Sequence, residues 1–114
     1  MLERQALSAF AALSQETRLR ILRLLVVAGA EGLPAGEIAD RVAASASNVS
    51  FHLKELERAG LLAARRQGRS IIYCADYAGL AGLIRFLMED CCSGRQEICA
   101  PALACCTPEA EVAP

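Results

Sequence analysis

Tryptophan is absent from this chain, and other aromatic residues are scarce. Only three of the 114 residues are Phe and two are Tyr, whereas hydrophobic residues of all kinds make up 54% of the sequence. The core is therefore expected to consist mainly of Leu, Ile, Val and Ala. A chain of this length forms one domain with a modest core, and it is too short for an elaborate, pocketed enzyme.

Long apolar runs are also missing. A membrane-spanning helix needs roughly 20 mostly apolar residues, but the longest candidate, ILRLLVVAGA, is short and contains Arg23. The N-terminal MLERQALSAF has no apolar signal core and carries an acid beside its basic residue. These absences predict a cytoplasmic protein with no membrane partner, in a compartment where thiols are kept reduced.

The chain has almost no net charge, because twelve Lys and Arg oppose thirteen Asp and Glu. The balance conceals an asymmetry, since residues 41–70 contain six basic and two acidic side chains while residues 71–114 contain two basic and six acidic ones. A basic middle suggests a localised patch for a polyanion. Charge alone, however, is more typical of a solvated surface.

Helical spacing of apolar residues predicts three helices in the first third of the chain. The first covers residues 4–13 and the third residues 35–43. The second begins at Ser14, which is expected to cap it, and ends at Gly29 and Gly32. Their inward faces are expected to be Ala6, Phe10 and Leu13; Ile21, Leu22 and Leu25; and Ile38, Ala39 and Val42.

The stretch ASASNVSFHLKELERAGLL predicts a further helix, capped by Ser45 or Ser47. Its buried face is expected to be Val49, Leu53 and Leu56, and Gly60 stands where a helix C-cap belongs. Two short helices joined by a short turn are the layout of a helix-turn-helix.

A β-hairpin with a basic tip is expected next, in LLAARRQGRSIIYC, where three arginines flank a Gln67-Gly68 turn. A last helix over residues 76–90 carries an apolar stripe formed by Leu80, Leu83, Ile84, Leu87 and Met88. Gly79 and Gly82 lie beside this stripe, and because glycine weakens a helix, close approach of another backbone is the expected reason for them. No periodicity continues beyond Ser93, which predicts a loose tail.

In this order the elements predict a mainly α fold with a small β-hairpin, a winged helix-turn-helix of about five helices. Such a fold places one helix in the major groove of DNA and the hairpin against the neighbouring backbone. The predicted DNA-binding residues are Ser45, Ser47, Asn48, Ser50 and His52 on the helix, and Arg65, Arg66 and Arg69 on the hairpin. Each also has a plainer interpretation: a serine as a cap only, His52 as a structural hydrogen-bonding group, the arginines as ordinary surface.

The segment SASNVSFHLKELERAGLLAARRQGRSIIY resembles the recognition helix and wing of the ArsR/SmtB family of bacterial metal-responsive repressors. The family's run V-S-x-H-L-x-x-L-x-x-A-G-L-[LV] stands here from Val49 to Leu62, and the similarity extends back to ETRLRIL, Glu16 to Leu22. The resemblance implies a homodimer, built from the first and last helices, that binds operator DNA of two-fold symmetry. Residues 1–90 would then form the DNA-binding and dimerisation domain, and residues 91–114 a cysteine-rich, largely flexible tail.

Members of this family place their sensor sites differently, and three arrangements lack their ligands here. The helix before the predicted recognition helix, LPAGEIADRV, has no paired cysteines. Zinc sites on the dimer helix use His and acidic ligands, but only Asp76 matches loosely and His52 is the single histidine. The redox arrangement pairs a cysteine of the second helix with one of the fifth, and the second helix has none.

Five of the six cysteines lie in EDCCSGRQEICAPALACC, residues 89–106. Soft thiolates favour soft ions such as arsenic(III), antimony(III), cadmium(II), lead(II) or copper(I). Structural zinc takes four ligands, whereas trivalent arsenic takes three thiolates. Adjacent helical residues point about 100° apart, so Cys91 and Cys92 can share an ion only where the helix ends, and a short loop after Ser93-Gly94 would deliver Cys99.

The family also contains arsenic repressors with a C-terminal Cys-Cys pair and a further Cys, and this chain is similar to them. The resemblance carries the metal-ligand role to Cys91, Cys92 and Cys99, with Cys105 or Cys106 as substitutes for the third ligand. Arsenic(III) is then the inducer, and no catalytic cofactor is expected. Arsenite, antimonite and methylated arsenic stay open as the true inducer.

The predicted function is an arsenic(III)-responsive repressor, released from its operator when the thiolates bind the inducer. A cadmium, lead or copper(I) sensor of the same family uses the same thiolates, and a structural zinc tail is a further alternative. A small thiol-dependent metalloid enzyme would need a low-pKa thiol in a formed anion pocket, for which the sequence supplies no loop. Cys74, outside the cluster, is expected to be a small buried apolar residue.

Overall fold

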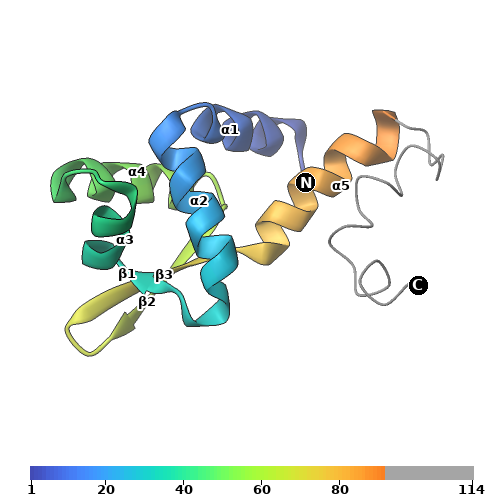
Figure 1. Ribbon diagram of the computed structural model, residues 1–114. Helices are drawn as coiled ribbons and strands as arrows, with labels where there is room; N and C mark the ends of the chain where they lie inside the picture. The colour runs from blue at the N-terminus through green and yellow to red at the C-terminus, as the bar shows by residue number, and fades with distance from the viewer. Residues whose placement is uncertain (92–114) are drawn as a thin grey trace, which may run out of the picture. The chain divides into compact units, whose positions relative to one another are not determined.

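The computed structural model describes residues 1–91 of the chain (Figure 1). The elements are α1 (Glu3–Leu13), α2 (Glu16–Ala28), a 3-10 turn η1 (Gly29–Glu31), β1 (Leu33–Pro34), α3 (Ala35–Val42), α4 (Ala46–Arg58), β2 (Leu62–Gln67), β3 (Ser70–Ala75) and α5 (Tyr77–Cys91). The predicted winged helix-turn-helix with five helices is confirmed. Residues Met1–Leu83 form one compact unit, and a second unit begins at Ile84, within α5.

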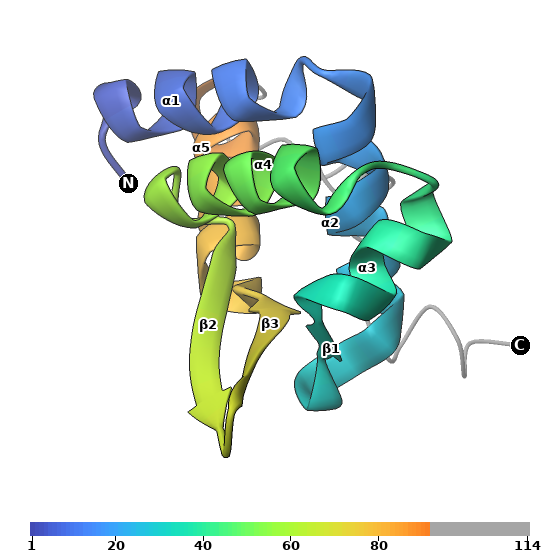
Figure 2. The same cartoon turned by 90° about the vertical axis from the view of Figure 1, so that its left-hand side faces the viewer.

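The wing contains three strands rather than the two of the predicted hairpin. β1 pairs antiparallel with β3, Leu33 opposite Tyr73, so the order in the sheet is β1-β3-β2 (Figure 2). Gln67 is paired with Ser70, which leaves Gly68 and Arg69 as the turn and corrects the predicted Gln67-Gly68 turn by one residue. Gly68 has φ +63°, a left-handed conformation that a tight hairpin turn requires and that glycine adopts readily.

The junction of α1 and α2 also differs from the prediction. Gln15, not Ser14, caps α2, because its side-chain oxygen accepts a hydrogen bond from the Arg18 backbone N–H at 2.8 Å. The Ser14 hydroxyl instead donates to the Ala11 carbonyl at 2.9 Å and closes the end of α1. Ser14 therefore belongs to the first helix rather than to the second.

The core lies between α2, α3, α4 and the sheet, and it is aliphatic as predicted. Its fully buried large side chains are Ile21, Leu25, Ile38, Val49, Leu53, Leu56 and Leu61. The predicted inward face of α1 is correct for Ala6 but wrong for Phe10, which is exposed, and the helix also buries Ala9 and Ala12. Small alanine side chains let α1 pack closely on α2 and α4. Val42, expected inside, is half-buried.

The end of α4 meets the start of α5. The Gly60 and Leu61 N–H groups donate to the Glu57 and Leu56 carbonyls, each at 3.0 Å, and Gly60 has φ +82°. This is the Schellman arrangement that commonly ends a helix. A Cβ placed on Gly79 would collide with the Gly60 carbonyl oxygen. The predicted close backbone approach is thus confirmed for Gly79, and its partner belongs to the same chain.

Within the α5 stripe, Leu83 is buried and Leu80 is half-buried. Of the predicted metal ligands, Cys91 is the last residue of α5. Cys92, Cys99 and the rest of the predicted loose tail lie outside the described residues. No helix in the described part of the chain is both long and apolar enough to span a membrane.

Candidate nucleic-acid interface

The helix-turn-helix is built around a tight turn between α3 and α4. Ala43 adopts the left-handed region at φ +56°, and the Ala44 N–H donates back to the Ala39 carbonyl at 3.1 Å. Ser45 then caps α4, because its hydroxyl oxygen accepts the Asn48 backbone N–H at 3.3 Å. Ser45 is therefore the cap, and Ser47 stands in the first turn of the helix with its side chain exposed.

One side of α4 is buried and the opposite side is open. Val49, Leu53 and Leu56 are fully buried, as predicted. With about 100° between successive helical residues, the opposite side carries Ser47, Phe51, Lys54 and Arg58, which we call the α4 outer face. Asn48 and Ser50, which are predicted to bind DNA, are also exposed.

Phe51 is the member of this face that sequence reasoning missed. Its side chain is 57% exposed although it is a large apolar group. The sequence could have predicted this exposure. Phe51 lies two residues from both Val49 and Leu53, so it falls on the side of α4 away from the core. It also occupies the x position between Ser50 and His52 in the family's run.

His52 is half-buried and contacts α2 rather than lying on the outer face. Arg18 Nε donates to His52 Nδ1 at 3.2 Å. Burial, and then the positive charge of Arg18, lower the pKa of His52 below its ordinary value of 6.5. Because Nδ1 accepts, the neutral ring carries its proton on Nε2. Arg18 is therefore the hydrogen-bonding partner that a structural role of His52 requires. A contact between His52 and DNA stays a prediction.

Arg18 also lies over the Phe51 ring. Its guanidinium carbon is 5.9 Å from the ring centroid, within the range of a cation–π contact. The Phe51 and His52 rings meet edge to face, with centroids 5.6 Å apart. We call these three side chains the Arg18 cluster; it connects the N-terminal turn of α2 to the middle of α4.

The three wing arginines have different surroundings. Arg65 donates from Nη1 to the Ala30 carbonyl at 2.9 Å and from Nη2 to the Glu31 carbonyl at 2.8 Å. It thereby fastens β2 to η1. Arg66 and Arg69 are exposed, and within the described residues neither makes a hydrogen bond or an ion pair. These two are the wing charges available to a phosphate backbone.

The elements that carry the predicted DNA-binding residues lie on one side of the Met1–Leu83 unit. Figure 2 views the molecule from the left of Figure 1, and α3, α4 and the β2–β3 hairpin all lie toward the viewer. Lys54 on α4, and Arg66 and Arg69 on the hairpin, have no acidic partner within the described residues. Arg41 and Arg58, in contrast, are paired with Glu37 and Glu55 at 2.7 and 2.8 Å.

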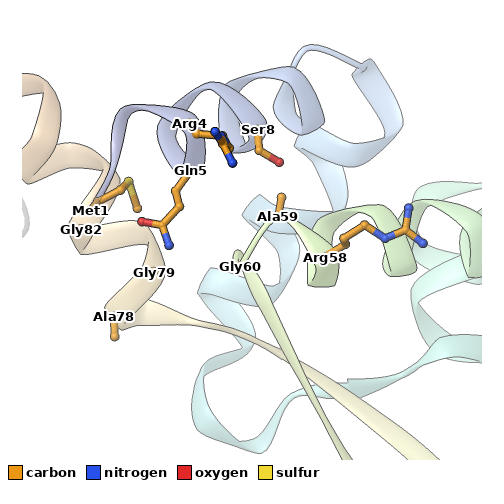
Figure 3. Close-up of a pocket in the computed structure, with 10 residues that line it drawn as sticks. All are labelled: Met1, Arg4, Gln5, Ser8, Arg58, Ala59, Gly60, Ala78, Gly79 and Gly82. Carbon is orange, nitrogen blue, oxygen red and sulfur yellow. The ribbon is translucent and has the colours of Figure 1, made fainter.

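A hollow of about 560 Å³ lies elsewhere, between α1, the end of α4 and the start of α5 (Figure 3). Its described lining consists of Met1, Arg4, Gln5, Ser8, Arg58, Ala59, Gly60, Ala78, Gly79 and Gly82. In Figure 3 the Arg58 side chain extends along α4, away from the hollow. The Gln5 side-chain oxygen is engaged by the Leu2 N–H at 2.8 Å. No Cys, His, Asp or Glu belongs to the described lining, so these residues do not form a catalytic acid–base set.

The predicted metal ligands cannot be brought together from the described residues, since of the three only Cys91 falls among them. Within that part of the chain no group of three His, Cys, Asp or Glu side chains is placed to hold a metal ion. Cys74 is half-buried rather than buried, and its Sγ lies 3.8 Å from the Ala63 carbonyl oxygen. The expectation of a buried apolar residue there is wrong in degree, because β3 is covered on only part of its surface.

Comparison with known proteins agrees with this architecture. Residues 13–65 match a family model described as a helix-turn-helix domain. The structure is similar to that of an ArsR-like transcriptional regulator from Rhodococcus sp. RHA1, with 33% identity and a TM-score of 0.71. That similarity covers 85% of this chain and 89% of the other.

Two further solved structures are similar. One, described as a possible transcriptional regulator for arsenical resistance, is 35% identical with a TM-score of 0.58, and the match covers 69% of this chain and 78% of that one. The other is the homodimeric winged helix-turn-helix DNA-binding domain of Mb0332 from Mycobacterium bovis, a possible ArsR-family regulator. It is 28% identical with a TM-score of 0.59, over 76% of this chain and 81% of that one.

A curated relative, the helix-turn-helix-type transcriptional regulator YceK of Bacillus subtilis (strain 168), is 43% identical over 61 residues. This match covers 54% of the present chain and 60% of the relative, so the chain spans about three fifths of that protein's length. The names of these relatives are those of transcriptional regulators, not of enzymes.

Proposed function

Because the chain belongs to the ArsR-like family of helix-turn-helix transcriptional regulators, we propose that it is an arsenic(III)-responsive repressor. It binds operator DNA of two-fold symmetry as a homodimer in the cytoplasm. Arsenic(III), bound by the thiolates of Cys91, Cys92 and Cys99, lowers its affinity for that DNA.

The DNA-binding part rests on the α4 outer face beside the wing. A helix whose exposed side carries Ser47, Asn48 and Ser50 presents short hydrogen-bonding groups to base edges in the major groove. Arg66 and Arg69, exposed and without acidic partners in the described part of the chain, suit phosphate oxygens on the adjacent backbone. The homodimer is supported by the homodimeric domain of Mb0332.

The arsenic part is supported by the donor chemistry and by one relative. Cys91 ends α5, and Cys92 follows it directly, so a vicinal thiol pair stands at a helix end with Cys99 close behind in sequence. Three soft thiolates suit a trivalent soft ion. The relative described as a possible regulator for arsenical resistance is 35% identical to this chain over the matched region.

A direct test uses a labelled duplex selected by the wild-type protein from a random-sequence library. Fluorescence anisotropy then measures affinity with and without arsenite for the wild type, Cys99→Ser and the matched Cys105→Ser. We expect arsenite to weaken DNA binding of the wild type and Cys105→Ser by at least about tenfold, the size of a typical allosteric coupling. Cys99→Ser should bind DNA normally and respond little.

Equal responses of Cys99→Ser and the wild type would assign the third ligand elsewhere, with Cys105→Ser and Cys106→Ser as the next variants. The same assay with cadmium, lead, copper(I) and zinc separates the alternatives. If a divalent ion or copper(I) weakens DNA binding and arsenite does not, the protein is a different thiolate sensor. If no ion has an effect and the purified protein contains zinc, the cysteines hold a structural metal.

A further inference from the structure

An exposed aromatic ring stands on the α4 outer face among polar groups. Phe51 lies between Ser47, one turn earlier, and Lys54, one turn later, and 57% of its surface is exposed. Both neighbours are polar residues. On a helix proposed to enter a DNA groove, such a ring is suited to an apolar group presented by the DNA.

The Arg18 cluster holds this ring in place. The Arg18 guanidinium lies 5.9 Å from the ring centroid on one side, and the His52 ring meets it edge to face at 5.6 Å. Arg18 is itself held by its 3.2 Å hydrogen bond to His52 Nδ1. The ring is therefore oriented before any partner binds, which lowers the entropic cost of a specific contact.

Only one apolar group is displayed among the base edges of the major groove, the C5-methyl group of thymine. We infer that Phe51 is a specificity-determining residue that recognises a thymine methyl group in each half-site. This inference rests on the proposed function as a DNA-binding regulator. Arg18 and His52 act through Phe51, as positioning residues. The contact selects T over C and over uracil at one position per half-site.

Deoxyuridine tests this inference, because it removes the methyl group and leaves every hydrogen-bonding group of the base unchanged. In the duplex selected by the wild-type protein, each symmetry-related pair of thymines is replaced in turn by deoxyuridine. Burying one methyl group contributes roughly a factor of four in affinity, so losing two should weaken wild-type binding about 15-fold at one pair of positions. At that pair Phe51→Ala should distinguish thymine from uracil less than twofold.

Lys54→Ala is the matched control on the same face. It removes a charge, so it should weaken binding to both duplexes alike and keep the thymine-to-uracil ratio. Arg18→Gln should lower the ratio without abolishing it, whereas a purely structural role for Arg18 would change both affinities equally. Circular dichroism should give Phe51→Ala a wild-type spectrum, since an exposed ring adds little to the core.

The outcomes separate the two proposals. If no sequence is enriched from the library, the proposed DNA-binding function fails. If a symmetric sequence is enriched but uracil is tolerated at every position, or the ratio survives in Phe51→Ala, the thymine contact is wrong and the DNA-binding function stands. Phe51 would in that case be free to contact another protein.

Discussion

His52 illustrates at the scale of single residues how one side chain serves two neighbours. It accepts a hydrogen bond from Arg18 on α2 and packs against Phe51 on its own helix. The hydrogen bond from Arg18 depends on a neutral ring, since a protonated imidazole has no acceptor and repels the guanidinium. Burial, and then the positive charge of Arg18, lower the pKa of His52, because both disfavour the protonated ring.

Stability should therefore fall as the pH is lowered. Above about 6.5, the ordinary value, His52 is neutral in both the folded and the unfolded chain. Below it the unfolded chain takes up a proton first, so the folded state loses stability until the pH has passed the lower pKa of the folded protein. We expect the melting temperature of the wild type to drop between pH 7.5 and 5.5, and to drop less in His52→Gln.

His52→Gln is informative because glutamine keeps a side-chain acceptor for Arg18 and cannot titrate. His52 is the chain's single histidine, so no other imidazole obscures the comparison. Equal pH dependence in the two proteins would mean that His52 does not control stability in this range.

At the scale of secondary-structure elements, the contact between α4 and α5 depends on two glycines. Gly60 provides the left-handed residue that ends α4, and Gly79 leaves room for the Gly60 carbonyl oxygen. Asp76 supports the junction from the α5 side, since its backbone N–H donates to the Leu61 carbonyl at 2.9 Å and its carboxylate accepts the Gly79 N–H at 3.0 Å.

Gly79→Ala and Gly82→Ala form a matched pair on this helix. The added methyl group at position 79 collides with backbone, so we expect the free energy of unfolding to fall by about 1–3 kcal/mol, the usual cost of overpacking. At position 82 the nearest atom is the flexible Met1 Cε at 3.4 Å. There the better helix propensity of alanine should leave stability unchanged or raise it by up to about 1 kcal/mol. Urea denaturation followed by circular dichroism measures both, and a destabilised Gly82→Ala together with a tolerant Gly79→Ala would contradict the described contact.

Sequence patterns predicted the elements well where large apolar residues repeat with a clear period. The buried face of α4, Val49, Leu53 and Leu56, is of this kind. The pattern was only partly right for α1, because it included the exposed Phe10 and left out Ala9 and Ala12, which are buried. β1 was missed because its two residues are a strand only through their pairing with β3, far along the chain.

The candidate site was predicted less completely, for physical reasons that involve distant partners. Arg65 is held by carbonyls 34 and 35 residues earlier, which no local pattern encodes. Phe51 was overlooked because a single aromatic residue in a helix usually belongs to the core, and only the position of its buried neighbours shows that it does not.

For the whole molecule, the proposed dimer gives the exposed apolar residues of α5 a purpose. Leu87 is 40% exposed within the stripe predicted to form the dimer interface. Leu87→Glu should weaken association by at least about tenfold, because an unpaired charge in an apolar contact is costly. Operator affinity should fall with it, since two half-sites need two recognition helices.

Val27→Glu is the control, because Val27 is 86% exposed on α2, a helix not expected to form the interface. Sedimentation velocity over a concentration series should give a dimer for the wild type and Val27→Glu, and a monomer at low concentration for Leu87→Glu. A wild-type monomer at all concentrations, or an undisturbed Leu87→Glu dimer, would remove α5 from the interface.

No side chain separates the end of α4 from the first turn of α5, because Gly60 and Gly79 meet backbone to backbone. A side chain between two helices absorbs small displacements by changing its rotamer, and two backbones lack that freedom. A shift of the first turn of α5 by a fraction of an ångström must then move the C-terminal end of α4 as well. The contact acts from the other side as well, so a displacement of the end of α4 is expected to move the first turn of α5. The end of α4 and the first turn of α5 are therefore expected to move together.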